Sequence, residues 1–229
     1  MLAGLDFSSA TVWSALGSIL LANVVLSGDN AVVIAMAART LKPEQRGKAI
    51  FFGSAAAIVM RILLTLIAIR LLGMPFLKII GGCLLAYIGV DLLGGEEDSD
   101  EGGESTTGMM GAIRTILVAD LVMSLDNVLA VAAAAKGNMP LLVIGLIVSI
   151  PLIVFGASLL TKVMERFPVI ITIGAALLGF LAGEMLLTDP AVASYLGSIG
   201  ETTVKAAGVV GAVLVVAVGN WMQRRGNPS

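Results

Sequence analysis

Apolar residues fill seven long runs of the chain, and most polar residues lie between these runs. Each run approaches or exceeds the roughly 20 residues that a helix needs to cross the hydrocarbon core of a bilayer. The runs cover residues 11–38, 47–72, 75–94, 109–136, 139–161, 167–187 and 205–222. The chain is 58% hydrophobic and 13% charged, which is unlike a soluble domain. The pattern predicts an all-α, polytopic membrane protein with about seven transmembrane helices.

Polar residues interrupt the first and fourth runs in the same way. Residues 23–30 of the first run align without a gap on residues 120–127 of the fourth. The aligned polar pairs are Asn23 with Asp120, Ser27 with Ser124, Asp29 with Asp126 and Asn30 with Asn127. An acid at the centre of a membrane helix costs about 2.5–3.5 kcal/mol on insertion scales, so a duplicated acid is expected to have a use. Gly28 favours a break in the first helix, whereas Leu125 at the equivalent place does not.

A second match extends the repeat, since residues 81–91 align on residues 174–184 with Asp91 on Glu184. The second run matches the fifth poorly, and the seventh has no partner. Three spans are an odd number, so the second unit must lie upside down, as in many transporters. The predicted parts are a first three-helix repeat (1–94), an acidic cytoplasmic linker (95–108), a second, inverted three-helix repeat (109–188), and an outer loop, seventh helix and C-terminal tail (189–229).

Lysine and arginine residues at the ends of the runs indicate the orientation of the chain. With the N-terminus outside, the inner ends carry Arg39, Lys42, Arg46, Lys48, Arg114, Lys162, Arg166, Arg224 and Arg225. The outer ends carry Arg70, Lys78, Lys136 and Lys205. Because cytoplasmic loops are enriched in basic residues, nine against four predicts an N-terminus outside and a C-terminus inside.

The ionisable residues inside the runs favour a site for a hard cation. The acids are Asp29, Asp91, Asp120, Asp126 and Glu184. One base, Arg61, lies near the middle of the second run, and we expect it to be the structural partner of an acid. The chain has no histidine and only one cysteine, Cys83, so carboxylate and amide oxygens are the ligands on offer. Such ligands suit manganese, magnesium or calcium. The surplus negative charge would otherwise need protons or water.

We expect one ion to bind between the two halves, near the membrane midplane, within reach of both Asp29 and Asp126. The candidate ligands are Asp29, Asn30, Asp120, Asp126 and Asn127. The candidate pathway residues are Asn23, Asp91 and Glu184. Two carboxylates would neutralise a divalent ion, and the empty site would take up protons, so metal binding is expected to weaken as the pH falls.

The paired Ser27-Gly28-Asp29-Asn30 and Ser124-Leu125-Asp126-Asn127 motifs, with an acid near the end of the third and sixth runs, resemble the TerC family of membrane proteins. The resemblance covers nearly the whole chain and extends to the lysine-exporter-like superfamily in its three-plus-three plan. It implies a Mn²⁺ exporter of a bacterial cytoplasmic membrane. The functional acids of the family fall on Asp29, Asp120 and Asp126, with Asn23 as a departure where the second half has Asp120.

Other functions stay open at this point. An exporter of a cationic amino acid would use carboxylates for the ammonium group and Arg61 for the substrate carboxylate. A membrane partner that delivers metal to exported proteins would need no transport cycle. An intramembrane aspartyl protease is disfavoured, because neither motif matches the Tyr-Asp and Gly-x-Gly-Asp pair of such enzymes, so no enzymatic activity is expected. The expected partners are the lipid bilayer and a divalent cation, without nucleic acid. Formation of a homo-oligomer, and Ca²⁺ in place of Mn²⁺, stay open.

Overall fold

The computed structural model describes residues 10–26, 28–72, 74–94, 106–134, 139–197 and 199–226. Every regular element within these ranges is an α-helix, which confirms the predicted all-α class. The helices are α1 (Ala10–Leu26), α2 (Gly28–Arg39), α3 (Pro43–Leu72), α4 (Leu77–Gly94), α5 (Thr106–Ala134), α6 (Met139–Arg166), α7 (Val169–Leu187), α8 (Pro190–Leu196) and α9 (Glu201–Gly226).

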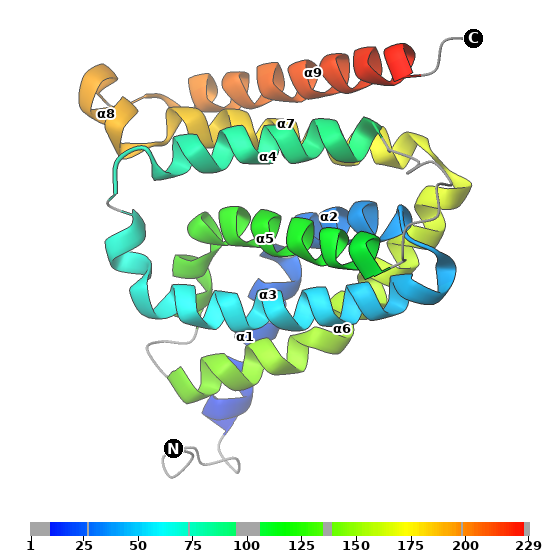
Figure 1. The fold of residues 1–229 in the computed structure, drawn as a ribbon. Coiled ribbons are helices and arrows are strands. Elements are labelled where there is room, and N and C mark those ends of the chain that lie inside the picture. Colours follow the sequence, from blue (N-terminus) through cyan, green and yellow to red (C-terminus); the bar gives the residue numbers. More distant parts are fainter. Residues whose placement is uncertain are drawn as a thin grey trace.

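Within the described ranges, six helices are long and apolar enough to cross a membrane, namely α3, α4, α5, α6, α7 and α9. The first predicted span, residues 11–38, is not one uninterrupted helix. It is divided into α1, of 17 residues, and α2, of 12 residues, which run in different directions (Figure 1). Gly28 begins α2, in line with the break expected at this glycine. Helix α5 passes the equivalent Leu125 without interruption.

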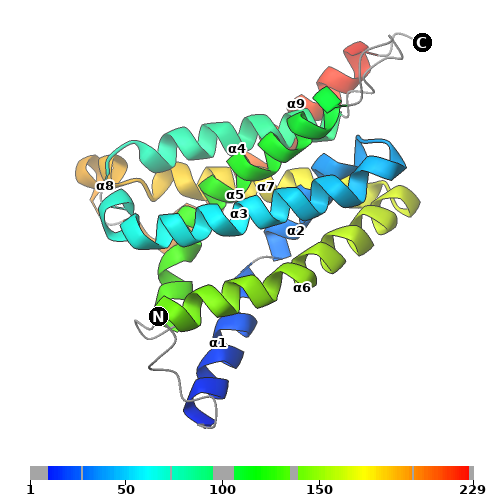
Figure 2. The same ribbon diagram turned by 60° about the horizontal axis from the view of Figure 1, so that its bottom comes forward.

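The helices form two groups. Helices α4, α7 and α9 lie side by side in a layer, and α7 packs against both of the others (Figure 1). Helices α1, α2, α3, α5 and α6 form a bundle below this layer in that view. Within the bundle α3 packs on α5, while α1 and α2 both pack on α6 (Figure 2). We call these groups the α4–α7–α9 layer and the bundle.

Small residues bring the helices of the layer close together. A β-carbon at Gly179 of α7 would lie 2.9 Å from Cα of Ala212 on α9, and Gly183 of α7 lies against the main chain of Ala207. Packing of this kind replaces the hydrophobic driving force that is missing between helices in lipid. The outward face of α9 is apolar and exposed, with Val210, Val213 and other large side chains, which suits contact with lipid.

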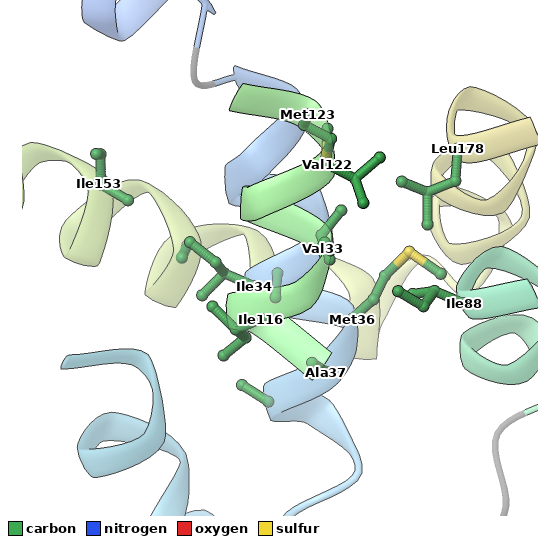
Figure 3. Close-up of a cluster of buried hydrophobic side chains, with 14 of the residues drawn as sticks. Val33, Ile34, Met36, Ala37, Ile88, Ile116, Val122, Met123, Ile153 and Leu178 are labelled. Carbon is green, nitrogen blue, oxygen red and sulfur yellow. The ribbon is translucent and has the colours of Figure 1, made fainter. Parts of the chain in front are cut away.

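The hydrophobic core lies where the bundle meets the layer. Met36 on α2 points toward Ile88 on α4 and Leu178 on α7 (Figure 3). All three side chains are buried. A β-carbon at Gly174 of α7 would lie 2.6 Å from the sulfur of Met36, so the glycine leaves the room that the methionine fills. The layer and the bundle therefore share a packed interface to which both α2 and α5 contribute.

One end of the molecule is held together by polar side chains. Arg39, at the end of α2, donates from Nη2 to the carbonyl oxygen of Leu92 at 2.8 Å. Gln223 of α9 donates to the carbonyl oxygen of Leu93 at 2.8 Å. Arg46 of α3 forms an ion pair with Glu165 of α6. The last turns of α2, α4, α6 and α9 and the first turn of α3, which include most of the predicted inner basic residues, therefore meet at the same end.

Asp189 fastens the opposite end. Its side chain is fully buried in the loop after α7. Oδ1 accepts hydrogen bonds from the backbone N–H groups of Ala191, at 2.7 Å, and Phe76, at 2.9 Å. Oδ2 accepts from Lys78, at 3.0 Å, and Ile79, at 3.3 Å. One carboxylate thus caps α8 and the first turn of α4, which satisfies N–H groups that a helix leaves unpaired.

Candidate functional site

A buried ion pair joins α3 to α5 inside the bundle. Arg61 Nη2 lies 2.5 Å from Asp120 Oδ1. Ser124, one helical turn after Asp120, accepts a hydrogen bond from Arg61 Nε at 3.1 Å and donates to Asp120 Oδ2 at 3.2 Å. Arg61 is 1% exposed and Asp120 is 5% exposed. Arg61 is therefore the partner of an acid, as expected from the sequence.

The packing of α3 on α5 explains why these two residues meet. A β-carbon at Gly53 of α3 would lie 2.8 Å from Cδ1 of Ile116 on α5, so the two helices are close at this level. Arg61 and Asp120 follow Gly53 and Ile116 on their helices, so α3 and α5 run in the same direction. A buried ion pair is tolerated only when further hydrogen bonds satisfy both partners, and Ser124 provides such bonds to each of them.

Asp29 adds a second acid from the first turn of α2. The backbone N–H of Asn30 donates to Asp29 Oδ1 at 2.8 Å. The side chain is half-buried and close enough to Arg61 and Asp120 to interact with both electrostatically. The positive end of the α2 dipole offsets part of the cost of burying this carboxylate. Three charged side chains, from α2, α3 and α5, are therefore brought into one region.

Asn30 is the exceptional residue of this region. It is 3% exposed, and neither its side-chain oxygen nor its side-chain nitrogen has a hydrogen-bond partner in the described part of the chain. Buried amides are nearly always paired, since leaving one unpaired costs about 1–3 kcal/mol. An unpaired buried carbonyl beside a carboxylate is a group that could bind an ion.

The remaining predicted site residues fall into two sets. The structure does not describe the side chains of Asn23, Asp126 and Asn127, although helices α1 and α5 contain these positions. Asp91 is exposed on α4. Glu184 is half-buried on α7 and interacts electrostatically with Lys205 of α9. Within the described residues no three His, Cys, Asp or Glu side chains form a group that could hold a metal. The role of each as a ligand or pathway residue stays a prediction.

Sequence reasoning missed Ser124 and Asp189 as important polar residues. Ser124 belongs to the repeated motif, and its place four residues after Asp120 was a usable signal, because such residues share a helix face. Asp189 had one local signal, since Asp189-Pro190 is a typical start of a helix. Its contacts with the start of α4 bridge more than 100 residues of sequence, and no local pattern indicates them.

The architecture defines a polytopic helical membrane protein with charged groups buried between its helices, an arrangement that generally marks a functional site. The sequence profile of the integral membrane protein TerC family matches residues 8–227. The chain belongs to this family, which confirms the resemblance seen in its motifs.

Relatives of the chain are bacterial membrane proteins. It is 46% identical over 178 residues to the uncharacterized membrane protein YjbE of Bacillus subtilis, covering 78% of this chain and 81% of that protein. It is 25% identical to the uncharacterized membrane protein YceF of the same species, covering 76% and 70%. The UPF0053 inner membrane protein YoaE of Escherichia coli is 24% identical, over 71% of this chain and 35% of that protein. No solved structure is significantly similar to the chain.

Proposed function

We propose that the chain exports a divalent metal cation, Mn²⁺, across the bacterial cytoplasmic membrane. The observation that carries the proposal is the unpaired, buried amide of Asn30 beside Asp29, at the break between α1 and α2. Broken helices whose ends meet near the midplane form the ion sites of many transporters. The proposed ligands are oxygen atoms of Asp29, Asn30, Asp126 and Asn127, which suit a hard cation.

The proposal includes seven crossings, with α1 and α2 together forming the first. It also includes an inverted repeat that relates this span, α3 and α4 to α5, α6 and α7. Contacts between α4 and α7 support the repeat. Gly82 lies against Ala182, and Gly89 lies against Ala175. In the alignment of the two halves Gly82 corresponds to Ala175 and Gly89 to Ala182. An exchange of the halves therefore turns one contact into the other, as a two-fold axis requires.

A second pair of contacts gives the same support. Ile19 of α1 lies against Gly145 of α6, and Ile116 of α5 lies against Gly53 of α3. Ile19 and Ile116 are equivalent when the alignment of residues 23–30 on residues 120–127 is extended by four residues toward the N-terminus. These contacts support a register between the second and fifth spans, which match poorly in sequence, and in this register Gly53 is equivalent to Gly145.

The proposed orientation has the N-terminus outside and the C-terminus inside. The support is the meeting of the basic helix ends on one side, where α2, α6 and α9 finish and α3 begins. Such a concentration of Lys and Arg is typical of the cytoplasmic side.

Export of a cationic amino acid gains no support from the structure. In that function Arg61 would bind the carboxylate of the substrate, but its guanidinium is engaged by Asp120 and Ser124. A transport role also differs from a metal-delivery role in one measurable way, since only a transporter moves the ion across a bilayer without another protein.

Flux into liposomes tests the proposal directly. The purified protein should move Mn²⁺, and Asp29→Asn should lower the initial flux by at least about tenfold, since even residues behind the ligands change metal affinity 10–100-fold. Glu44→Gln is the control, because it removes the same charge from an exposed position. Parallel measurements with Ca²⁺ and Mg²⁺ define selectivity. Equal flux in the parent and Asp29→Asn would refute the proposed site, and no flux above that of empty liposomes would refute transport.

A further inference from the structure

The two halves of the chain differ in one coordinated way. Asp120 lies four residues after Ile116, and its equivalent Asn23 lies four residues after Ile19. Arg61 lies eight residues after Gly53, and the residue eight after Gly145 is Ile153. The register set by the Ile–Gly contacts thus makes Arg61 equivalent to Ile153. Of the two contacts that the repeat relates, the one between α3 and α5 carries an ion pair, and the one between α1 and α6 has two neutral residues at the equivalent positions.

The charge difference involves both partners together. Ile153 is buried in the hydrophobic core, as Arg61 is buried against α5. Where the arginine is replaced by isoleucine, the aspartate is replaced by asparagine. If Asp120 were needed as an ion ligand, the chain would gain nothing by supplying it with a permanent cation, because arginine does not lose its proton in proteins. The acid and the base are expected to occur together if each is present to neutralise the buried charge of the other.

From this relationship we propose that Arg61 is a tethered cation that holds Asp120 and sets the charge, and therefore the cation affinity, of the site around Asp29. Asp120 is then the anchor of Arg61 and not a ligand of the transported ion. The guanidinium interacts with Asp29 as well as with Asp120. It therefore weakens the attraction of the site for cations, which favours release of the ion after each crossing. This inference rests on the proposed function, because it concerns the same site.

Substitutions should separate this role from a structural one. Arg61→Gln makes the site one charge more negative, so Mn²⁺ should bind about tenfold more tightly or better. Asp120→Asn leaves the positive charge of the guanidinium near Asp29 without the carboxylate of Asp120 to offset it. Mn²⁺ should therefore bind about tenfold more weakly or worse, because charges inside a protein interact more strongly than charges in water. Both variants should unfold at lower temperature than the parent, since each removes one partner of a buried ion pair. A merely structural pair would lower stability in both variants without shifting affinity in opposite directions.

The double variant Arg61→Gln/Asp120→Asn is decisive. It restores the net charge of the pair, so it should recover most of the Mn²⁺ affinity that Asp120→Asn loses. The measurement is Mn²⁺ binding to purified protein by calorimetry, with thermal unfolding of each variant as the check on folding. A folded double variant that binds as weakly as Asp120→Asn would make Asp120 a ligand and overturn the inference.

A structure of the unmodified protein with Mn²⁺ provides an answer that does not depend on any variant folding. Arg61 should remain hydrogen-bonded to Asp120, and the anomalous signal of Mn²⁺ should lie beyond ligand distance of Asp120. An ion about 2.0–2.6 Å from Asp120, the range for hard cations, would overturn the inference. Failure of the unmodified protein to bind Mn²⁺ would instead overturn the proposed function, so the two failures are distinguishable.

Discussion

Gly82 of α4 lies directly against the main chain of α7 at Ala182. A β-carbon at Gly82 would be 2.9 Å from the carbonyl oxygen of Ala182, closer than real β-carbons come to such an atom. A backbone carbonyl in a helix cannot rotate away as the end of a flexible side chain can. The absence of a side chain at Gly82 is therefore a condition for the close approach of α4 and α7, on which the α4–α7–α9 layer depends.

The first prediction follows from this contact. Gly82→Ala should destabilise the protein by about 1–3 kcal/mol, the usual cost of overpacking. Gly111→Ala is the matched control, since an added β-carbon there meets nothing within 4 Å. The control should be neutral or slightly stabilising, because alanine favours a helix more than glycine does. Thermal unfolding in the same detergent compares the two, and equal midpoints would show that the contact is not tight.

Removal of the Asp189 carboxylate should also destabilise the protein. Asp189→Ala leaves four N–H groups at two helix starts without their acceptor. Replacement of one helix cap costs about 0.5–2 kcal/mol, so a loss of about 1–4 kcal/mol is expected for the two. Glu44→Gln, which removes an exposed carboxylate in the first turn of α3, should leave the unfolding midpoint nearly unchanged. A midpoint for Asp189→Ala equal to that of the parent would contradict the capping role.

The same residue predicts a pH dependence. Burial by itself would raise the pKa of Asp189, but the backbone N–H donors of Phe76, Ala191, Ile79 and Lys78 hold the pKa below its ordinary value. Because the pKa of Asp189 is lower in the folded state than in the unfolded state, the ionised carboxylate stabilises the folded protein. This stabilisation is complete above the pKa of the unfolded state, about 3.9, and is lost as the pH falls through the pKa of the folded state. The stability difference between the parent and Asp189→Asn should therefore be constant from about pH 5 to 8 and shrink below about pH 4.

Much of the fold could be predicted from the sequence because lipid imposes simple rules. Six of the predicted spans coincide with single long helices, since an apolar run must satisfy its backbone hydrogen bonds internally. The break at Gly28 was also visible, as glycine is the weakest helix former after proline. The pairing of Arg61 with an acid was predictable, because a lone buried base has no other way to reduce its cost.

Other features depended on packing that no local pattern records. Five acids lay within the predicted spans, and hydropathy could not tell which one would meet Arg61. The choice of Asp120 follows from the register of α3 on α5, which the contact of Gly53 with Ile116 defines. The unpaired state of Asn30 is likewise a property of its surroundings. An asparagine in an apolar run predicts only that the amide needs a partner.

The orientation can be tested by labelling single cysteines in a Cys83→Ser background. Ser99→Cys, in the acidic linker, should react with a membrane-impermeant maleimide only after the cells are opened. Thr202→Cys, in the exposed first turn of α9, should react from outside in intact cells. The reason is that an odd number of crossings separates the two positions in the proposed topology. The reverse pattern of labelling would invert the chain in the membrane and would contradict the positive-inside assignment.

Asn30 provides the sharpest contrast between stability and function. Asn30→Leu replaces an unpaired buried amide with an apolar side chain of similar size, so the variant should be as stable as the parent or more stable by about 1–3 kcal/mol. Ser54→Ala is the control, because the hydroxyl of Ser54 is also buried and, within the described residues, unpaired.

Both variants should therefore unfold at or above the temperature of the parent protein. Only Asn30→Leu should lose Mn²⁺ flux in liposomes, since it removes an oxygen proposed to bind the ion, whereas Ser54→Ala should retain it. Functional sites commonly keep groups that reduce stability, and this pattern would identify Asn30 as one of them. If Asn30→Leu lowered the unfolding temperature and Mn²⁺ flux stayed at the level of the parent, the amide would be a structural group with an unseen partner, and the ion site would have to lie elsewhere.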